Sequence, residues 1–341
     1  MTIRELYETS ENKTLSPSAV RSSESKGRKI AIPECDIRTC FQRDVDRITH
    51  SKAFRRLMRK TQVFLRPEGD HYRTRLTHTL EVSRIARTMA RALRLNEDLV
   101  EAMALAHDLG HTPFGHAGEY ALNEVVPGGF QHNVQGVRVL ERIENNGSGL
   151  NLCKEVLEGV LCHTGPLEAS TLEGKLLKFA DRIAYINHDI DDALRAGILK
   201  PSDIPRHLSG LLGEKYQQRI DTMVHDVILN SGETEISMSS EIGSAMNELR
   251  DFMFERVYRN PVAKSEESKA IDMLRKLYEY YVALPESLPS EYRHLAEEDG
   301  VERAVCDYIA GMTDSYAVSR FRDLFIPKGW SFVEAERNKN D

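Results

Sequence analysis

The sequence has few of the features that mark membrane, secreted or disulfide-bonded proteins. It contains no run of about 18 or more apolar residues, so we expect no transmembrane helix. The segment from Met1 to Thr14 is polar and lacks the apolar core of a secretory signal. Cysteine is scarce, with five residues in 341, and no CxxC spacing occurs. An odd number of scattered cysteines indicates reduced thiols, so we expect a cytoplasmic protein without a disulfide framework or zinc knuckle.

The charge of the chain is unevenly distributed. A net charge of −7 argues against a protein built mainly to hold nucleic acid. From Arg43 to Arg94, however, there are 14 Lys and Arg against 5 Asp and Glu, a balance of +9, which leaves −16 for the remainder. A basic segment inside an acidic protein suits a compact polyanion, and a set of solvated helix faces is the alternative.

Apolar residues recur at helical spacing along most of the chain, and no convincing set of alternating strands is present. This pattern predicts an all-α fold, with at most a short β hairpin near Glu233 to Met238. We divide the chain into an N-terminal tail or arm (1–35), a helical core (36–200) and a C-terminal helical lobe packed on that core (201–341). The expected helices cover residues 41–63, 76–95, 97–109, 133–143, 152–162, 174–194, 208–227, 242–258, 267–284 and 302–324.

Three chemically active residues fall on the apolar faces of predicted helices. His78 lies four residues before Val82, and His107 lies four residues after Met103, so both imidazoles point inward. Asp181 lies at the centre of an apolar stripe. Because a buried carboxylate is costly unless a charged group meets it, Asp181 requires a cation.

The stretch from His107 to Glu119 concentrates three histidines and two carboxylates: His107, Asp108, His111, His116 and Glu119. Adjacent side chains diverge by about 100° on a regular helix, so the first two reach one ion only near a helix end. We expect Gly110 to provide that end. The others remain for proton transfer, since a carboxylate three residues from an imidazole can orient and charge it.

Two imidazoles and two carboxylates, from His78, His107, Asp108 and Asp181, make a mixed nitrogen and oxygen site. Such a site suits Mn²⁺, Fe²⁺, Co²⁺, Ni²⁺ or Zn²⁺, and Mg²⁺ is also compatible with it. A metal with open positions lowers the pKa of bound water toward about 7 and so supplies a hydroxide nucleophile. By contrast, we interpret His163 and His188 as hydrogen-bonded core residues and Asp191 and Asp192 as solvated.

The order of His78, the pair His107–Asp108 and Asp181 matches the HD-domain metal-dependent phosphohydrolases, although the His–Asp pair alone is a weak signal. Longer strings are more specific, and through them the sequence resembles the dGTPase family, the deoxyguanosine triphosphate triphosphohydrolases. The resemblance covers about residues 15 to 200 and thins out beyond. The strings are RDVDRI at 43–48, AFRRL at 53–57, KTQVF at 60–64, HDLGHTPFGH at 107–116 and DRIAY at 181–185.

This resemblance implies an HD-domain core that cleaves a dNTP between the 5′ oxygen and the α phosphorus, releasing deoxynucleoside and intact triphosphate. In that reaction a metal-activated water attacks the α phosphorus. By position, the four residues of the mixed site are the metal ligands. His116, backed by Glu119, is the implied catalytic histidine that assists the leaving 5′ oxygen, and His111 lines the phosphate side.

The resemblance also implies a substrate-binding set. Gln62 would contact the sugar, Tyr185 would pack against the deoxyribose, and Asp189 would accept a hydrogen bond from the 3′ hydroxyl. Tyr185 also offers a steric reason to exclude a 2′ hydroxyl. Phosphate oxygens would be bound by Arg75 and Arg182, with His132 a further candidate. In the C-terminal lobe no motif distinguishes a phosphate role from a surface position for Tyr258, Arg259 and Lys264, and we favour the surface position.

Two other functional classes remain open. An HD-type nucleotidase or cyclic-nucleotide phosphodiesterase would share the metal ligands without needing the basic segment. A non-catalytic nucleotide sensor or single-strand nucleic-acid binder would use the same basic cleft. Relatives are commonly oligomeric, often hexameric, so we expect a homo-oligomer, and a second dNTP is a possible allosteric activator. No membrane partner is expected.

Overall fold

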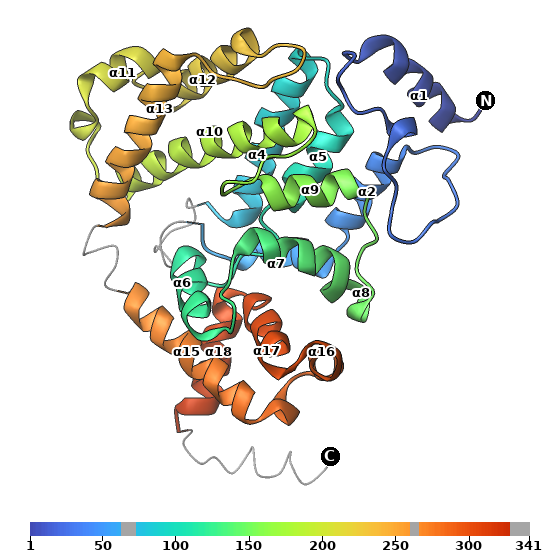
Figure 1. Cartoon of the computed structure of the whole chain (residues 1–341). Coiled ribbons are helices and arrows are strands. Elements are labelled where there is room, and N and C mark those ends of the chain that lie inside the picture. Colours follow the sequence, from blue (N-terminus) through green and yellow to red (C-terminus); the bar gives the residue numbers. More distant parts are fainter. Residues whose placement is uncertain (63–72, 260–265, 328–341) are drawn as a thin grey trace, which may run out of the picture.

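The structure, a computed structural model, describes residues 1–62, 73–259 and 266–327. None of these residues belongs to a β-strand, and their two β-bridges are isolated, which confirms the prediction of an all-α fold. Among the described residues, no helix combines the length and apolarity required to cross a bilayer. Figure 1 shows a larger group of helices above and a smaller group below it.

The larger group is built around the long helix α10 (Leu172–Arg195), which packs against α4 (Arg75–Ala92). Both helices begin at a threonine whose side chain accepts a hydrogen bond from the first turn, Thr74 in α4 and Thr171 in α10. Around them lie α1 (Ile3–Thr14), α2 (Cys40–Thr49), α3 (Lys52–Arg56), α5 (Glu97–Ala106), α7 (His132–Arg138), α8 (Glu144–Gly147), α9 (Lys154–Cys162), α11 (Arg206–Leu212), α12 (Tyr216–Asn230) and α13 (Ser240–Met253).

The smaller group has its own apolar core, which combines one helix from the middle of the chain with helices from its end. Its members are α6 (Gly115–Val125), α15 (Glu267–Ala283), α16 (Ser290–Asp299), α17 (Val301–Ala310) and α18 (Asp314–Phe325). By contrast, apolar residues of α11, α12 and α13 belong to the core of the larger group. The expected lobe of residues 201–341 is therefore divided between two cores.

Residues 1–35, expected as a tail or arm, contain the helix α1, which was not predicted from the sequence. Thr2 and Glu5 cap the start of α1 reciprocally, the Thr2 amide donating to Glu5 Oε2 at 2.7 Å. No residue of α1 is buried, so its apolar pattern gave no sign of a helix. Farther along, Arg28 forms a bridge with Cys153 and pairs with the fully buried carboxylate of Asp44. The arm is thus anchored on the larger core of its own chain.

We expect replacement of Arg28 with Met to destabilise the protein by about 3–5 kcal/mol, because Asp44 would remain buried without its cation. Chemical denaturation of purified protein measures this change. The matched control is Arg38→Met, which removes an exposed ion pair with Asp46 and should cost about 0–1 kcal/mol. Equal effects of the two substitutions would contradict the anchoring role of Arg28.

Three further local predictions differ from the structure or lie outside it. The segment expected as a β hairpin, 233–238, is a loop that a hydrogen bond from the Gly232 amide to the Glu235 carbonyl closes at 2.9 Å. Helix α16 was not predicted, because half of its ten residues are charged and only Tyr292 and Leu295 are buried. The turn expected at 66–70 lies outside the described residues.

Candidate active site and metal centre

A cavity of about 540 Å³ is lined by residues of both helix groups. Most residues predicted to form the site line it: Gln62, Arg75, His78, Asp108, His111, His116, His132, Asp181, Tyr185 and Asp189. His107 lies immediately behind this lining, within reach of Asp108 and Asp181, and Glu119 lies behind His116 and His132. Arg182 is half-buried and is not a lining residue.

The four residues expected to bind a metal converge at the inner end of this cavity. His78 Nε2 lies 3.2 Å from Asp181 Oδ1 and 3.8 Å from Asp108 Oδ2. His107 Nε2 lies 3.4 Å from Asp108 Oδ1 and 3.7 Å from Asp181 Oδ1. Two histidines and one aspartate of this set already have donor atoms close enough to share one ion. Of the four residues, His78 comes from α4 and Asp181 from α10, whereas His107 and Asp108 directly follow α5.

The protonation of His107 makes the cluster suited to a cation. Its Nδ1 lies 2.7 Å from the Ala104 carbonyl, so this nitrogen carries the proton and donates. Its Nε2 is buried without a hydrogen-bond partner and therefore presents a lone pair toward Asp108 and Asp181. A lone pair and two carboxylates facing one point repel one another unless a cation lies between them. The cluster can therefore hold a divalent metal, as the donor set predicted.

Electrostatics keep both carboxylates of the cluster ionised. Burial alone would raise the pKa of Asp108, but positive charge around its carboxyl group, including the guanidinium of Arg75, holds this pKa well below its usual value. The pKa of Asp181 is likewise lowered, since its contact with His78 outweighs the effect of burial. Both groups are thus ready to bind a metal at neutral pH.

The turn after α5 brings His107 and Asp108 to one ion, and Gly110 contributes to it differently from what was expected. Helix α5 ends at Ala106, before Gly110, and Gly110 does not adopt a left-handed conformation. A Cβ atom at this position would lie 2.0 Å from the His132 carbonyl oxygen and 2.2 Å from the Gly136 amide nitrogen. Glycine is therefore required because α7 packs directly against this turn.

The outer histidines form a second cluster in which Glu119 is central. Its Oε1 accepts hydrogen bonds from the His132 amide at 2.9 Å and from His132 Nδ1 at 3.0 Å, whereas His116 Nδ1 lies 3.8 Å from Oε2. The imidazole nearest to Glu119 is thus His132, and His116 is its more distant neighbour. His111 stacks on His132 with ring centroids 3.9 Å apart, and its Nε2 lies 3.1 Å from Asp108 Oδ1, so it joins this cluster to the metal ligands.

A tight turn and a hydrogen bond to Asp314 position His116. Phe114 and Gly115 both have positive φ, 62° and 56°, and His116 follows in the first turn of α6. The Phe114 amide donates to Asp314 Oδ1 at 3.0 Å, and Asp314 Oδ2 accepts from the Thr61 amide at 2.9 Å. Because Asp314 starts α18, the smaller helix group determines where His116 lies.

The part of the cavity farther along α10 fits the predicted order of groups. Tyr185 and Asp189 follow Asp181 along the helix and line the cavity. Burial raises the pKa of Asp189 to about 7, and the Tyr258 hydroxyl donates a hydrogen bond to its carboxyl. Tyr258 and Arg259, which we favoured as surface residues, both line the cavity. Lys264 lies outside the described residues.

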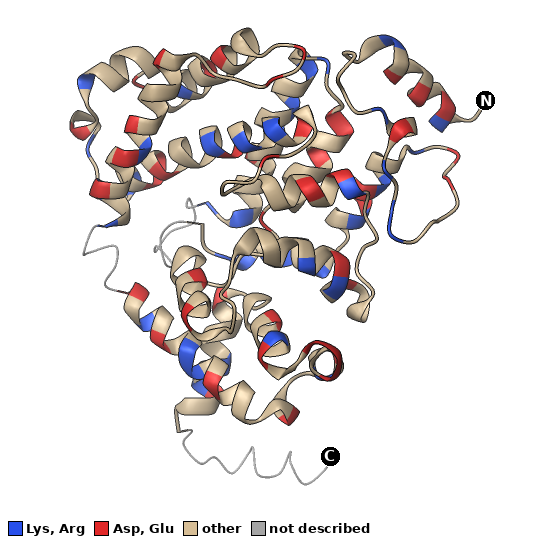
Figure 2. Cartoon of the chain, viewed as in Figure 1, with Lys and Arg blue, Asp and Glu red and all other residues tan. Residues whose placement is uncertain are grey.

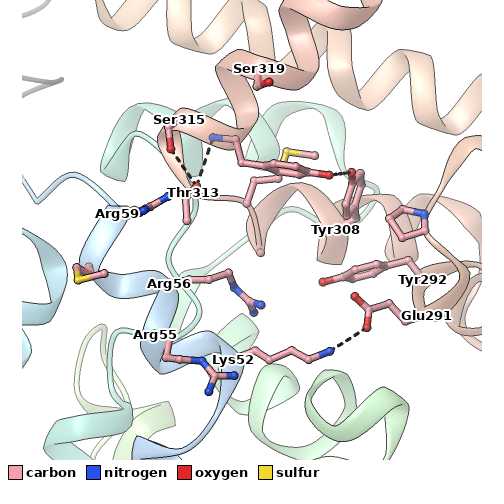
Figure 3. A pocket seen from close by; sticks show the side chains of 15 residues that line it. Lys52, Arg55, Arg56, Arg59, Glu291, Tyr292, Tyr308, Thr313, Ser315 and Ser319 are labelled. Atoms are coloured by element: carbon pink, nitrogen blue, oxygen red, sulfur yellow. Dashed lines mark hydrogen bonds and ion pairs between the residues drawn. The ribbon is translucent and has the colours of Figure 1, made fainter. Parts of the chain in front are cut away.

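The basic segment of residues 43–94 is divided among different environments, and Figure 2 shows acidic and basic residues interspersed over both helix groups. Arg75 lines the cavity, but its Nη1 already donates to Asp108 Oδ2 at 2.8 Å. Arg87 and Arg91 form ion pairs with Glu97 on the surface, as the alternative of solvated faces predicted. A second cavity of about 720 Å³ is faced by four other basic side chains, shown in Figure 3: Lys52, Arg55, Arg56 and Arg59.

Sequence reasoning missed several residues because their environment depends on tertiary contacts. Asp192, expected to be solvated, is buried and lies 3.1 Å from Arg73, which also pairs with Asp191 at 2.9 Å. His163 is buried, and its Nδ1 bonds to the Val160 carbonyl at 2.7 Å, as expected of a core residue, but it also lines the cavity, with its Nε2 3.3 Å from His132 Nε2. The available signal in the sequence was that His163 follows the apolar residue Val160 by three positions, which places both on one side of a helix.

Comparison with known proteins is consistent with this geometry. The HD domain family matches residues 75–186, which include all four candidate ligands, and a phosphohydrolase-associated domain matches residues 236–323. Among solved structures, a phosphohydrolase from Bacteroides thetaiotaomicron aligns with a TM-score of 0.53 at 17% identity, covering 87% of this chain and 71% of that chain. This likeness concerns the fold alone.

Two relatives are similar over nearly their whole length. A deoxyguanosinetriphosphate triphosphohydrolase-like protein from Caldanaerobacter subterraneus subsp. tengcongensis is 58% identical over 331 residues, covering 97% of this chain and 98% of the relative. One of the same description from Clostridium perfringens is 52% identical over 338 residues, covering 96% and 99%. An HD domain implies a divalent metal and a phosphohydrolase activity. The chain belongs to the family of deoxyguanosinetriphosphate triphosphohydrolase-like proteins, within the HD-domain phosphohydrolases.

Proposed function

We propose that this protein hydrolyses deoxynucleoside triphosphates to deoxynucleoside and intact triphosphate. The observation that carries the proposal is the joining of a buried two-histidine, two-aspartate cluster to an outer histidine and glutamate cluster in one cavity. The names of the relatives support the same substrate class. Mn²⁺ or Mg²⁺ is the proposed ion, and Fe²⁺, Co²⁺, Ni²⁺ and Zn²⁺ suit the same donors.

The residues of the inner cluster would hold the ion through His78, His107, Asp108 and Asp181. A divalent ion bound there lowers the pKa of coordinated water toward about 7 and polarises a phosphoryl oxygen. Arg75 keeps Asp108 ionised and oriented through its 2.8 Å contact. These residues are thus preorganised for a metal ion, because burial and pairing determine their charges and orientations in the absence of substrate.

The outer cluster would handle the leaving group. His116 lines the cavity with an exposed ring, so it can approach the 5′ oxygen and donate a proton there as that oxygen leaves. Glu119 carries a pKa lowered by His116 and His132 despite its burial, so its carboxylate can support the imidazolium form of His116. His111 and His132 would face the phosphates from their stacked position.

The sugar would lie along α10. Tyr185 would pack on the deoxyribose, Asp189 would accept from the 3′ hydroxyl, and Gln62 would contact the sugar from the other wall. Tyr258, which donates to Asp189, would orient that carboxyl. The candidate place for an activating dNTP is the second cavity, which is lined by the four basic side chains and Tyr308 (Figure 3) and also by Tyr316.

Product analysis tests this proposal directly. Each dNTP and the four-dNTP mixture would be incubated with the protein and Mn²⁺ or Mg²⁺, and the products separated by ion-exchange chromatography. We expect deoxynucleoside and tripolyphosphate in equal amounts, and no turnover with chelator. Release of pyrophosphate with monophosphate, or of single phosphates, would contradict the assigned reaction and favour a nucleotidase. Activity with the mixture but not with single dNTPs would indicate activation by a second nucleotide.

A further inference from the structure

Three side chains form a continuous line that leads from the protein surface to the candidate ligand His78. Glu81 Oε2 lies 2.6 Å from His188 Nε2, and His188 Nδ1 lies 3.2 Å from His78 Nδ1. The other ring nitrogen of His78, Nε2, faces Asp181. Glu81 and His78 are on α4, whereas His188 is on α10, so the line crosses between the two central helices of the larger group. His188 is completely buried.

One assignment of protons fits the distances along this line when His78 binds a cation. A ligand nitrogen must be unprotonated, so His78 Nε2 presents its lone pair and Nδ1 carries the proton. That proton is donated to His188 Nδ1, which must then be an acceptor. The proton of His188 is therefore on Nε2, which lies 2.6 Å from the Glu81 carboxylate but outside hydrogen-bond geometry in this structure.

Arg73 holds the outer end of the line in place. Its Nε donates to Glu81 Oε2 at 3.2 Å, and its Nη1 pairs with Asp191 at 2.9 Å, while its guanidinium lies over the Tyr216 ring at 5.3 Å. Burial alone would raise the pKa of Glu81, but the contact with His188 and the charge of Arg73 bring it below its usual value. Glu81 is consequently ionised and oriented, although its side chain is half-exposed.

We infer that Glu81 and His188 are positioning residues that hold His78 in the tautomer and orientation needed to bind the metal. The other imidazole ligand has a different arrangement, since the Ala104 carbonyl orients His107. The position of a backbone carbonyl is determined by the helix itself, whereas the orientation of His78 depends on two side chains. Outer contacts of this kind, from a carboxylate to a ligand histidine, commonly determine metal affinity. The inference rests on the proposed metal site and not on the identity of the substrate.

Two substitutions of His188 separate its hydrogen-bonding role from its packing role. In His188→Leu the acceptor for His78 Nδ1–H is lost while an apolar side chain fills the space. In His188→Asn the amide oxygen lies near the former position of Nδ1 and can accept the same proton. We expect the Leu variant to bind Mn²⁺ about 10–100-fold more weakly than the wild type, and the Asn variant to recover most of the affinity.

The experiment is calorimetric titration of Mn²⁺ into the full-length, chelator-treated chain, without nucleotide. Thermal melting of the metal-free variants provides the test of folding, and long-range ¹H–¹⁵N spectra report the tautomer of His78. A weaker affinity in Leu with recovery in Asn, at similar melting temperatures, supports the inference. Wild-type affinity in the Leu variant, or equal loss in both variants, overturns it.

Glu81 allows an independent check of the same line. Glu81→Gln keeps an oxygen that can accept from His188 Nε2–H, whereas Glu81→Leu does not, so only the latter should lose Mn²⁺ affinity and mix the His188 tautomers. Equal affinities in the two variants would count against a role for Glu81. Failure of the proposed function is distinguishable: an absence of triphosphate release with these affinity changes intact would reject the reaction and leave the positioning role standing.

Discussion

Replacing Asp108 with Ala is expected to abolish hydrolysis and to weaken Mn²⁺ binding by more than about 100-fold, beyond what loss of an outer contact costs. Asp108 faces four partners, since its two oxygens lie 3.4 Å from His107, 3.1 Å from His111, 2.8 Å from Arg75 and 3.8 Å from His78. The substitution removes a ligand and leaves the charge of Arg75 buried without its counter-ion. Calorimetric titration and product chromatography measure the two losses.

Because a buried Arg75 without its counter-ion would also lower the stability of the protein, the experiment requires two further variants. Asp108→Asn keeps the volume and one oxygen near Arg75 but removes the negative charge, so metal affinity should still fall while folding is preserved. The matched control is Asp307→Ala in α17, another buried aspartate that pairs with Arg138 at 2.6 Å. This control should lose stability but keep its Mn²⁺ affinity. Turnover in Asp108→Asn equal to that of the wild type would mean that the site is misplaced.

Replacing His116 with Ala is expected to lower kcat by about 10²–10⁴-fold, the range for losing a positioned general acid. Metal affinity should not change, because His116 is not part of the inner cluster. Nor should the melting temperature change, since the His116 side chain is 82% exposed. Steady-state kinetics with each dNTP, together with Mn²⁺ titration, measure these quantities on one preparation.

The control for His116 is His207→Ala, another exposed histidine paired with a glutamate, here Glu248 at 2.8 Å on the far helices α11 and α13. Its loss should leave turnover unchanged. Near wild-type turnover in His116→Ala would reject the general-acid role. The closer contact of Glu119 with His132 then makes His132 the next residue to replace.

The inner cluster was predictable from sequence because each ligand carries a local signal. His78, His107 and Asp181 share helix faces with apolar residues, and a helix places such residues toward the core whatever that core contains. Short-range periodicity thus predicted the all-α fold and the inward positions of these three candidate ligands.

Contacts between distant segments were not predictable in the same way. Asp192 was expected to be solvated, but it is buried beside Arg73. Tyr258 was expected at the surface, but its hydroxyl donates to Asp189 on α10. The smaller core likewise joins α6 to helices more than a hundred residues later. A helical pattern says which face is buried but not which partner covers that face, so these pairings lie beyond single-sequence reasoning.

The sequence by itself determined the helical class, the inward ligands and the histidine-rich stretch from His107 to Glu119, because these follow from spacing along a helix and from residue chemistry. Only the tertiary structure decided which partners the side chains of this stretch contact. It placed Glu119 closer to His132 than to His116, placed His188 between His78 and Glu81, and joined the turn before His116 to Asp314. The physical reason is that hydrogen bonds of about 3 Å depend on how packed helices are placed against one another, which periodicity does not specify.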